Sequence, residues 1–265
     1  PLARATSQNI MSAMRDRQAF LAKIRRALGH DPVKSRGAAA LFDTPEPSAQ
    51  TLPPDGSLLE QLSAAGAAMQ TPVTAVSDPA TAATAIARLA VESQPEWGDT
   101  KQIVCWDHPL VNALQLKERL AADKIAVHRL GCDTLPIGSA PPKEAWRQMM
   151  ADAYIGITSA LYCLADTAAL VLQTAPGQPR AASLLPSIHV AVIHQSQIIA
   201  DLKSLYRLLE TDFHAGGDPL GNSLTMITGP SKTADIEATM VYGAHGPRAL
   251  HIVVIAEKDK KPLPS

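Results

Sequence analysis

The feature that most constrains this fold is an alternation, from about residue 58 onward, of short β-branched runs with longer alanine-rich stretches. β-branched residues favour strands, and alanine favours helices. The predicted strands are Val73–Val76, Gln102–Trp106, Ile125–Leu130, Tyr154–Thr158, Ala169–Gln173, Ile188–Ile193, Leu224–Thr228 and Leu250–Ile255. The predicted helices are Pro79–Val91, Leu110–Ala121, Lys143–Ala151, Ser196–Leu209 and Thr233–Val241. This order predicts an α/β fold with an open, largely parallel sheet flanked by helices.

The first 57 residues differ from the rest of the chain in composition. Phe20, Leu21, Ile24 and Leu28 recur at helical spacing, which predicts a short amphipathic helix. This helix would pack on its own domain or on a second copy of the chain; a role at a membrane surface is less favoured because its apolar face is short. A proline-rich stretch follows over residues 31–57 and indicates a linker or surface arm. We therefore expect an N-terminal helix and arm over residues 1–57 and one domain over residues 58–258.

Composition excludes several classes of function. The net charge of -1 leaves no basic excess for a phosphate backbone, and aromatic residues are 4% of the chain, so no nucleic-acid partner is expected. No apolar run approaches the roughly 20 residues that cross a bilayer. The three cysteines form no C-x-x-C pair, so we expect no metal or iron–sulfur cluster in this chain, and free thiols in the cytoplasm.

The segment Gly229-Pro230-Ser231-Lys232-Thr233 follows a predicted strand and precedes a predicted helix. Free N–H groups at the start of a helix favour an anion, so the segment predicts a turn that binds phosphate or carboxylate, or a capped structural turn. It is no Walker A loop, because Ser231 and Met226 occupy the positions that require glycine.

Two further groups lie just downstream. On the predicted helix, Asp235 and Glu237 point in different directions, so they are not expected to act together as a general acid and base. One of them binds a substrate hydroxyl or stabilises the preceding turn, or both are solvated or capping acids. His245 and Gly246 precede the last strand, where a histidine transfers protons, binds an anion or simply holds a turn.

A second polar cluster surrounds the strand Ala169–Gln173. Asp166 and Thr167 precede it, Arg180 follows it, and His189 lies in the next strand. Ligand sites of α/β proteins form on such loops at the sheet edge. Strand alternation places His189 on the face of Ala191 and Ile193, where a hydrogen-bonded core histidine is as good an interpretation as a ligand.

Other catalytic motifs are absent from the sequence. Gly216–Gly221 precedes a strand instead of following one, so it is no dinucleotide fingerprint. Neither G-x-S-x-G nor H-E-x-x-H occurs.

The sequence TGPSKTADIE followed by GAHGPRALHIVVI resembles the signature of the LUD domain family, in particular its lactate utilisation protein C branch. The blocks ADTAALVL and LLPSIHVAVI, with Arg180 between them, resemble the middle of that family. The likeness covers roughly residues 60–256. One position departs from it: the family usually has Glu-Thr-Gly where this chain has Asp166-Thr167-Ala168, and alanine disfavours positive φ.

The resemblance implies a NagB/RpiA/CoA-transferase-like fold and a part in oxidising L-lactate to pyruvate beside separate iron–sulfur subunits, which would carry the clusters. A small anionic ligand or a partner surface would bind between the Asp166–Arg180 and Gly229–His245 clusters. The alternatives are a stand-alone CoA-transferase-like enzyme for a phosphorylated or thioester anion, and a regulatory module that binds a ligand.

Overall fold

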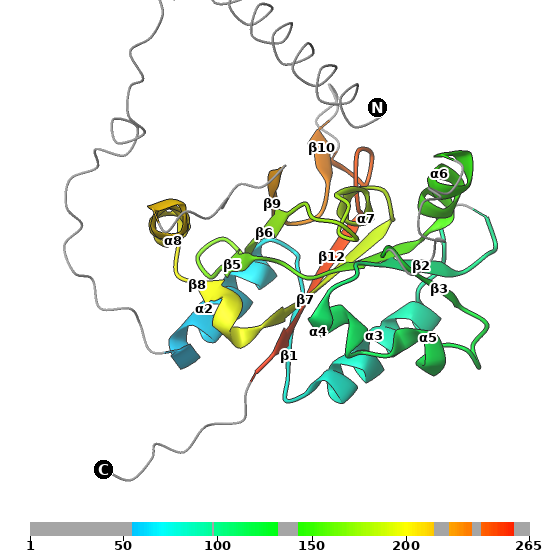
Figure 1. The fold of residues 1–265 in the computed structure, drawn as a ribbon, viewed down its shortest axis with the longest axis horizontal. Helices are drawn as coiled ribbons and strands as arrows, with labels where there is room; N and C mark the ends of the chain where they lie inside the picture. Colours follow the sequence, from blue (N-terminus) through cyan, green and yellow to red (C-terminus); the bar gives the residue numbers. More distant parts are fainter. Residues whose placement is uncertain (1–54, 97, 132–142, 215–222, 235–239, 257–265) are drawn as a thin grey trace, which may run out of the picture. The chain divides into compact units, whose positions relative to one another are not determined.

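The structure is a computed structural model and describes residues 55–96, 98–131, 143–214, 223–234 and 240–256 (Figure 1). The chain divides into two units, residues 1–51 and 52–265, and the predicted N-terminal helix and most of the proline-rich arm lie outside the described residues.

The central element is a six-stranded sheet in the order β1-β12-β7-β4-β2-β3. Every neighbouring pair in it is parallel, so the predicted α/β fold with a largely parallel sheet is confirmed. The strands, in sheet order, are β1 (Val73–Val76), β12 (Ala249–Ile255), β7 (Ile188–His194), β4 (Ile155–Thr158), β2 (Gln102–Cys105) and β3 (Ala126–Arg129). The inner strands carry mostly apolar side chains on both faces, and the polar exceptions Thr158 and His189 are buried as a pair.

One face of the parallel sheet is covered by α3 (Pro79–Glu92), α4 (Pro109–Asn112) and α5 (Leu116–Arg119) (Figure 1). α3 begins where Asp78 accepts a hydrogen bond from Thr81 N at 2.8 Å, and Pro79 suits the first turn because it needs no donor. Ala82, Ile86 and neighbouring small residues then form its buried stripe against the sheet.

The opposite face packs against α2 (Asp55–Ala68), α7 (Ala181–Leu184) and a second sheet in the order β8-β5-β6-β9. The strands of this sheet are β5 (Tyr162–Leu164), β6 (Ala169–Gln173), β8 (Ile198–Ile199) and β9 (Leu224–Thr228). The outer side of this sheet packs against α8 (Leu202–His214) through Leu205. The remaining elements are α6 (Lys143–Asp152), the short 3-10 helix η3 (Gln195–Gln197) and a two-stranded hairpin of β10 (Lys232–Ala234) and β11 (Met240–Tyr242).

Three predicted helices differ from the structure. The stretch Leu110–Ala121 is broken into α4 and α5, because Gln115 adopts a left-handed conformation at φ 49° between them. The stretch Ser196–Leu209 forms the end of η3 and the strand β8 before α8 begins at Leu202, because Ile198 and Ile199 pair with β5. The predicted helix Thr233–Val241 is replaced at both described ends by β10 and β11. No helix within the described residues is long and apolar enough to span a bilayer.

Candidate functional site

Within the segment from Thr228 to Pro247, β10 and β11 pair as antiparallel strands where a helix was predicted. Thr233 pairs with Val241 across β10 and β11, and both side chains are β-branched, which favours pairing over helix. Asp235 and Glu237 lie outside the described residues, so the structure leaves their predicted roles as predictions.

Two backbone donors of this segment bond within the segment itself. Ser231 N donates to Pro247 O at 2.8 Å, Gly243 N donates to Ser231 O at 3.0 Å, and Pro230 has no N–H. Because β10 replaces the start of the predicted helix, anion binding by this turn has no helix N-terminus to support it and stays a prediction.

The hairpin instead walls a cavity at the amino ends of the parallel strands, which we call the amino-edge hollow. Its volume is about 610 Å³. Its lining comes from the residues just before β4 and β7, from the end of α7 and from the loop after β11. The lining residues are Glu96, Ala151, Asp152, Ala153, Tyr154, Leu184, Leu185, Ser187, Tyr242, Gly243, Ala244, His245 and Gly246. Of the predicted site residues, His245 and Gly246 lie in this wall.

Polar side chains that line the amino-edge hollow form hydrogen bonds within the protein. Ser187 Oγ donates to Glu96 Oε2 at 2.8 Å, and Asp152 Oδ1 accepts from Gln148 Nε2 at 2.7 Å. Tyr242 Oη donates to Gln70 Oε1 at 2.9 Å. With two carboxylates in the wall, the hollow favours a cationic group over an anion.

Asp166 and Thr167 form the turn between β5 and β6. Thr167 Oγ1 donates to Asp166 Oδ1 at 3.0 Å, and Asp166 N donates to Ala200 O at 3.2 Å. Ala168 follows with φ 51°, so this chain places an alanine in the left-handed region. Since Ala169 pairs with Thr228, this turn lies beside the end of β9, next to Gly229.

Arg180 and His189 lie elsewhere. Arg180 is exposed and precedes α7, at the other end of β6 from the Asp166 turn. His189 is fully buried, its Nε2 lies 2.8 Å from Thr158 Oγ1, and burial lowers its pKa to about 3. The predicted residues therefore do not converge on one cavity: His245 and Gly246 line the amino-edge hollow, whereas His189 lies in the core.

Sequence reasoning missed four residues that shape the amino-edge hollow: Glu96, Asp152, Ser187 and Tyr242. They come from four separate segments and have no fixed spacing, so no sequence motif connects them. Within the described ranges, no group of three or more His, Cys, Asp and Glu side chains is placed to hold a metal ion.

The LUD domain profile matches residues 59–255. This chain belongs to the LUD domain family. Among its relatives in the family, a protein of Halalkalibacterium halodurans named lactate utilization protein C is 32% identical over 168 residues, which cover 62% of this chain and 67% of that protein. A protein of the same name from Exiguobacterium sp. is 36% identical over 112 residues, 42% of this chain and 48% of its own. The uncharacterized protein YkgG of Escherichia coli is 29% identical over 63% of this chain and 68% of its length.

The matches thus span about half to two thirds of the length of these LUD relatives. The crystal structure of a DUF162 family protein from Deinococcus radiodurans is similar with a TM-score of 0.50 and 19% identity, covering 76% of this chain and 98% of that one. At this identity the likeness supports the α/β fold alone.

Proposed function

We propose that this chain is a cytoplasmic accessory subunit of a system that oxidises L-lactate to pyruvate, and that a partner protein docks in the amino-edge hollow. Relatives named lactate utilization protein C support the process. The cysteines form no C-x-x-C pair, which supports placing the iron–sulfur centres on separate subunits.

The observation that carries the docking proposal is the pairing of exposed apolar side chains with carboxylates in the amino-edge hollow. Leu185 is 59% exposed and Tyr242 is 44% exposed, beside Glu96 and Asp152. Interfaces bury aromatic and aliphatic anchors at their centre and place charges at the rim. The expected partner segment therefore carries an apolar side chain flanked by Lys or Arg.

Growth on L-lactate tests the process. The gene is deleted in the native host, in a strain without another lactate oxidase, and complemented with the wild type, with Leu185→Ser/Tyr242→Ser, or with Tyr206→Ser. Tyr206 is the matched control because it is a 58% exposed tyrosine on α8, which does not line the hollow. We expect wild type and Tyr206→Ser to restore growth on L-lactate, the double variant to fail, and all strains to grow on pyruvate. Normal growth of the deletion strain on L-lactate contradicts the proposal.

Purification from native cells tests the partner. Iron–sulfur proteins identified by mass spectrometry should accompany the tagged wild type and Tyr206→Ser but not the double variant. A chain that purifies alone and turns over CoA esters or sugar phosphates contradicts the accessory role and favours a stand-alone enzyme.

A further inference from the structure

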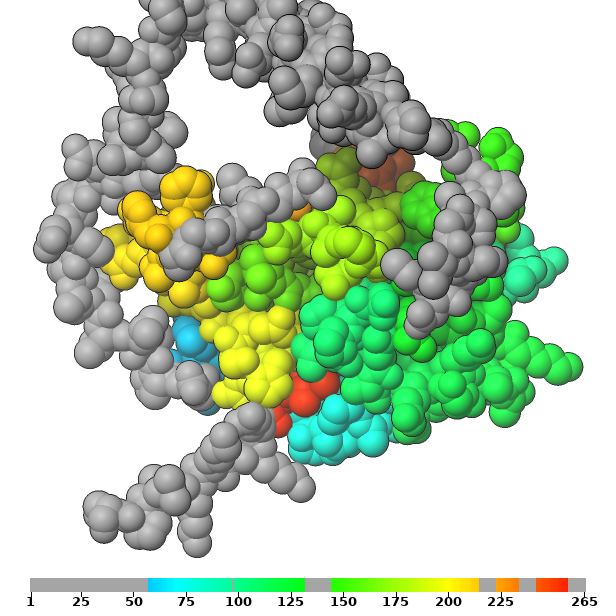
Figure 2. All heavy atoms as spheres, in the orientation of Figure 1, coloured from blue at the N-terminus to red at the C-terminus, as the bar shows by residue number. Residues whose placement is uncertain are grey.

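Helix α8 carries a surface that the proposed function does not use. The helix covers the outer side of the second sheet, and of its residues only Leu205 is buried there. Four of the eight exposed large apolar side chains among the described residues lie on this one helix, namely Leu202, Tyr206, Leu208 and Phe213. In Figure 1 and Figure 2, α8 lies at one side of the domain, in yellow and orange. Apolar side chains that cluster in this way on a surface mark an interaction site.

Three of these side chains form one stripe along α8. Leu202 lies four residues before Tyr206 and Phe213 lies seven after it, so at 3.6 residues per turn all three are on the same side of the helix. Leu209, which is half-buried against the second sheet, completes the spacing of four, three and four residues that is typical of a seam between two helices. Leu208 lies on the other side of the buried face. We call Leu202, Tyr206 and Phe213 the α8 stripe.

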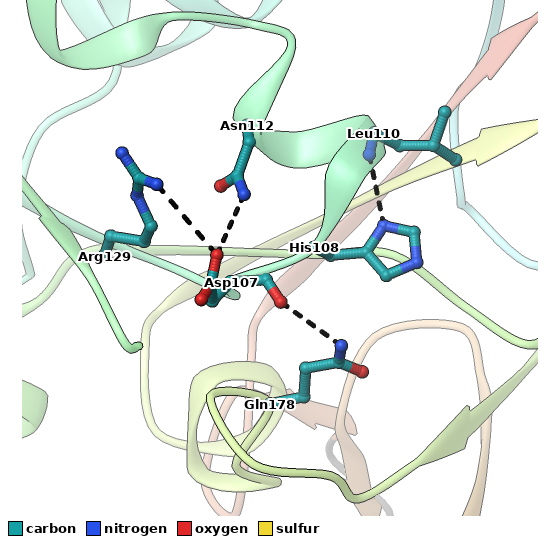
Figure 3. A network of polar contacts seen from close by, with 6 residues as sticks. All are labelled: Asp107, His108, Leu110, Asn112, Arg129 and Gln178. Carbon is teal, nitrogen blue, oxygen red and sulfur yellow. Dashed lines mark hydrogen bonds and ion pairs between the residues drawn. The ribbon is translucent and has the colours of Figure 1, made fainter. Parts of the chain in front are cut away.

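Two opposite charges flank the α8 stripe on the same side. Lys203 and Glu210 are seven residues apart, which places them two turns apart and almost in line along the helix. Lys203 is exposed and forms no salt bridge with any of the described residues, whereas the exposed Arg129 has the carboxylate of Asp107 at 4.0 Å in its own chain (Figure 3). Glu210 Oε1 lies 3.8 Å from His214 Nε2 on the same helix. A carboxylate accepts more than one donor, so Glu210 can also pair with a second cation.

The carboxylate that precedes Lys203 in the chain is engaged as the cap of α8. Asp201 Oδ1 accepts from Ser204 N and from Ser204 Oγ, both at 2.7 Å. A carboxylate that already accepts two hydrogen bonds competes weakly for Lys203, which leaves the lysine ammonium to a carboxylate of another molecule.

Antiparallel packing of two α8 helices joins these features. A two-fold axis at the middle of the stripe brings Leu202 beside Phe213 of the second copy. It also brings Lys203 to the side of the helix pair on which Glu210 of the second copy lies, and the same contact forms again with the copies exchanged. A parallel arrangement leaves Lys203 and Glu210 about 10 Å apart along the axis, at about 1.5 Å per residue, so it gains no ion pair.

The exposed area sets the expected strength of this contact. Tyr206 is 58% exposed, Phe213 is 48% exposed and Leu202 is 42% exposed. An aromatic side chain buries about 150–250 Å² in all, so the α8 stripe offers less than the roughly 800 Å² per partner of a standard interface. We therefore expect a weak dimer, with a Kd in the micromolar range.

We propose that the α8 stripe is a two-fold contact between two copies of this chain, with α8 antiparallel to α8 and Lys203 of each copy facing Glu210 of the other. None of these residues lines the amino-edge hollow, so the dimer and the proposed docking of a partner there stand or fail independently.

The first test is sedimentation velocity on the purified full chain from about 1 μM to about 1 mM, at low ionic strength because salt screens exposed ion pairs. We expect the wild type to pass from monomer to dimer over this range. Tyr206→Ser/Phe213→Ser should stay monomeric with an unchanged circular dichroism spectrum, because both side chains are exposed. A wild type that stays monomeric throughout overturns the proposal and leaves the stripe to a partner other than a second copy. A double variant that dimerises as the wild type does overturns it too.

The second test exchanges the charges. Lys203→Glu and Glu210→Lys each place like charges together in both contacts across the axis, so each should weaken the dimer about tenfold. Lys203→Glu puts an acid in the first turn, where the helix dipole favours it, so a weaker dimer does not reflect a lost helix. An equimolar mixture of the two variants should form a heterodimer, because each contact then joins opposite charges, and Lys203→Glu/Glu210→Lys in one chain should dimerise as the wild type does.

The matched controls are Lys117→Glu and Glu118→Lys, the same charge changes on exposed residues of α5, and both should dimerise as the wild type does. Two results contradict the proposed geometry. One is a dimer whose affinity is unchanged by Lys203→Glu. The other is a mixture that associates no more strongly than either variant alone.

Discussion

Gly156 lies in β4 where α7 crosses the strand. A Cβ added there would lie 1.8 Å from Ala182 O and 2.9 Å from Pro186 Cγ, and the carbonyl cannot rotate away as a flexible side chain can. We expect Gly156→Ala to lower the free energy of unfolding by about 3 kcal/mol, measured by urea denaturation, because α7 must move off the sheet.

The matched control for Gly156 is Gly98→Ala. Gly98 has φ 70° and nothing within 4 Å of its added Cβ, so this variant measures the cost of the left-handed backbone alone, about 1 kcal/mol. Equal losses in the two variants would show that α7 does not press on β4.

His189 gives the chain a pH-dependent stability. Its pKa is lowered to about 3 by burial, while an unfolded histidine titrates near 6.5. The unfolded state therefore binds more protons between these two values. The stability contributed by the neutral ring is complete above pH 6.5 and is lost as pH falls toward 3.

The variant His189→Gln removes this titration. We expect it to be less stable than wild type at pH 7 but to lose less stability between pH 6.5 and pH 4, measured as unfolding free energy against pH. His108 and His251 also have lowered pKa values, and they titrate in both proteins. Parallel curves would rule out His189 as a source of the dependence.

The break between α4 and α5 belongs to the scale of elements. Gln115 is exposed and adopts φ 49° and ψ 42°, a region that glycine occupies without cost. We expect Gln115→Gly to leave the unfolding free energy unchanged or slightly raised, whereas Lys117→Gly, inside α5, lowers it by about 0.5–1 kcal/mol. Equal losses measured by thermal denaturation would mean that the two positions share one continuous helix.

Elements with strong local signals were the predictable ones. Three predicted strands, Val73–Val76, Ala169–Gln173 and Leu224–Thr228, have the predicted bounds, and the predicted helix Pro79–Val91 ends one residue short of α3. Each strand is a short run bounded by turn residues such as Pro, Gly, Ser and Asp, and the helix has apolar residues at helical spacing after the cap at Asp78.

The missed elements owe their form to distant partners. β5 is three residues long and exists because it pairs with β6 and β8. From the sequence alone, the stretch Thr233–Val241 suggests a helix. The pairing of Thr233 with Val241, which makes two strands of its ends, is evident only in the structure. The residues of the amino-edge hollow were partly missed for the same reason. His245 was predicted from its motif, whereas Ser187 and Glu96 are distant in sequence and line the same cavity only because the chain folds.

At the scale of the molecule, the two sheets share one hydrophobic core. Leu170 of β6, Ile193 of β7 and Leu62 of α2 belong to the same buried cluster. We expect Leu170→Ala to lower the unfolding free energy by roughly 2–5 kcal/mol and to reduce hydrogen-exchange protection equally at Val171 and Val190, one reporter in each sheet.

Leu208→Ala is the control for Leu170, because Leu208 is 39% exposed on α8 and should cost little. If Val171 lost protection while Val190 kept it, the second sheet would be a separate folding unit, and the shared core would not hold the sheets together.

α7 and the residue Pro179 before it connect the two edges of the parallel sheet. The carbonyl of Pro179, just before α7, accepts the indole N–H of Trp106, which directly follows β2, and Leu184, the last residue of α7, lines the amino-edge hollow. β4, which it crosses, has four residues and spans only about 13 Å at about 3.3 Å per residue. A shift of α7 would therefore displace residues at both edges, and any coupling of binding at one edge to binding at the other would be equal in the two directions.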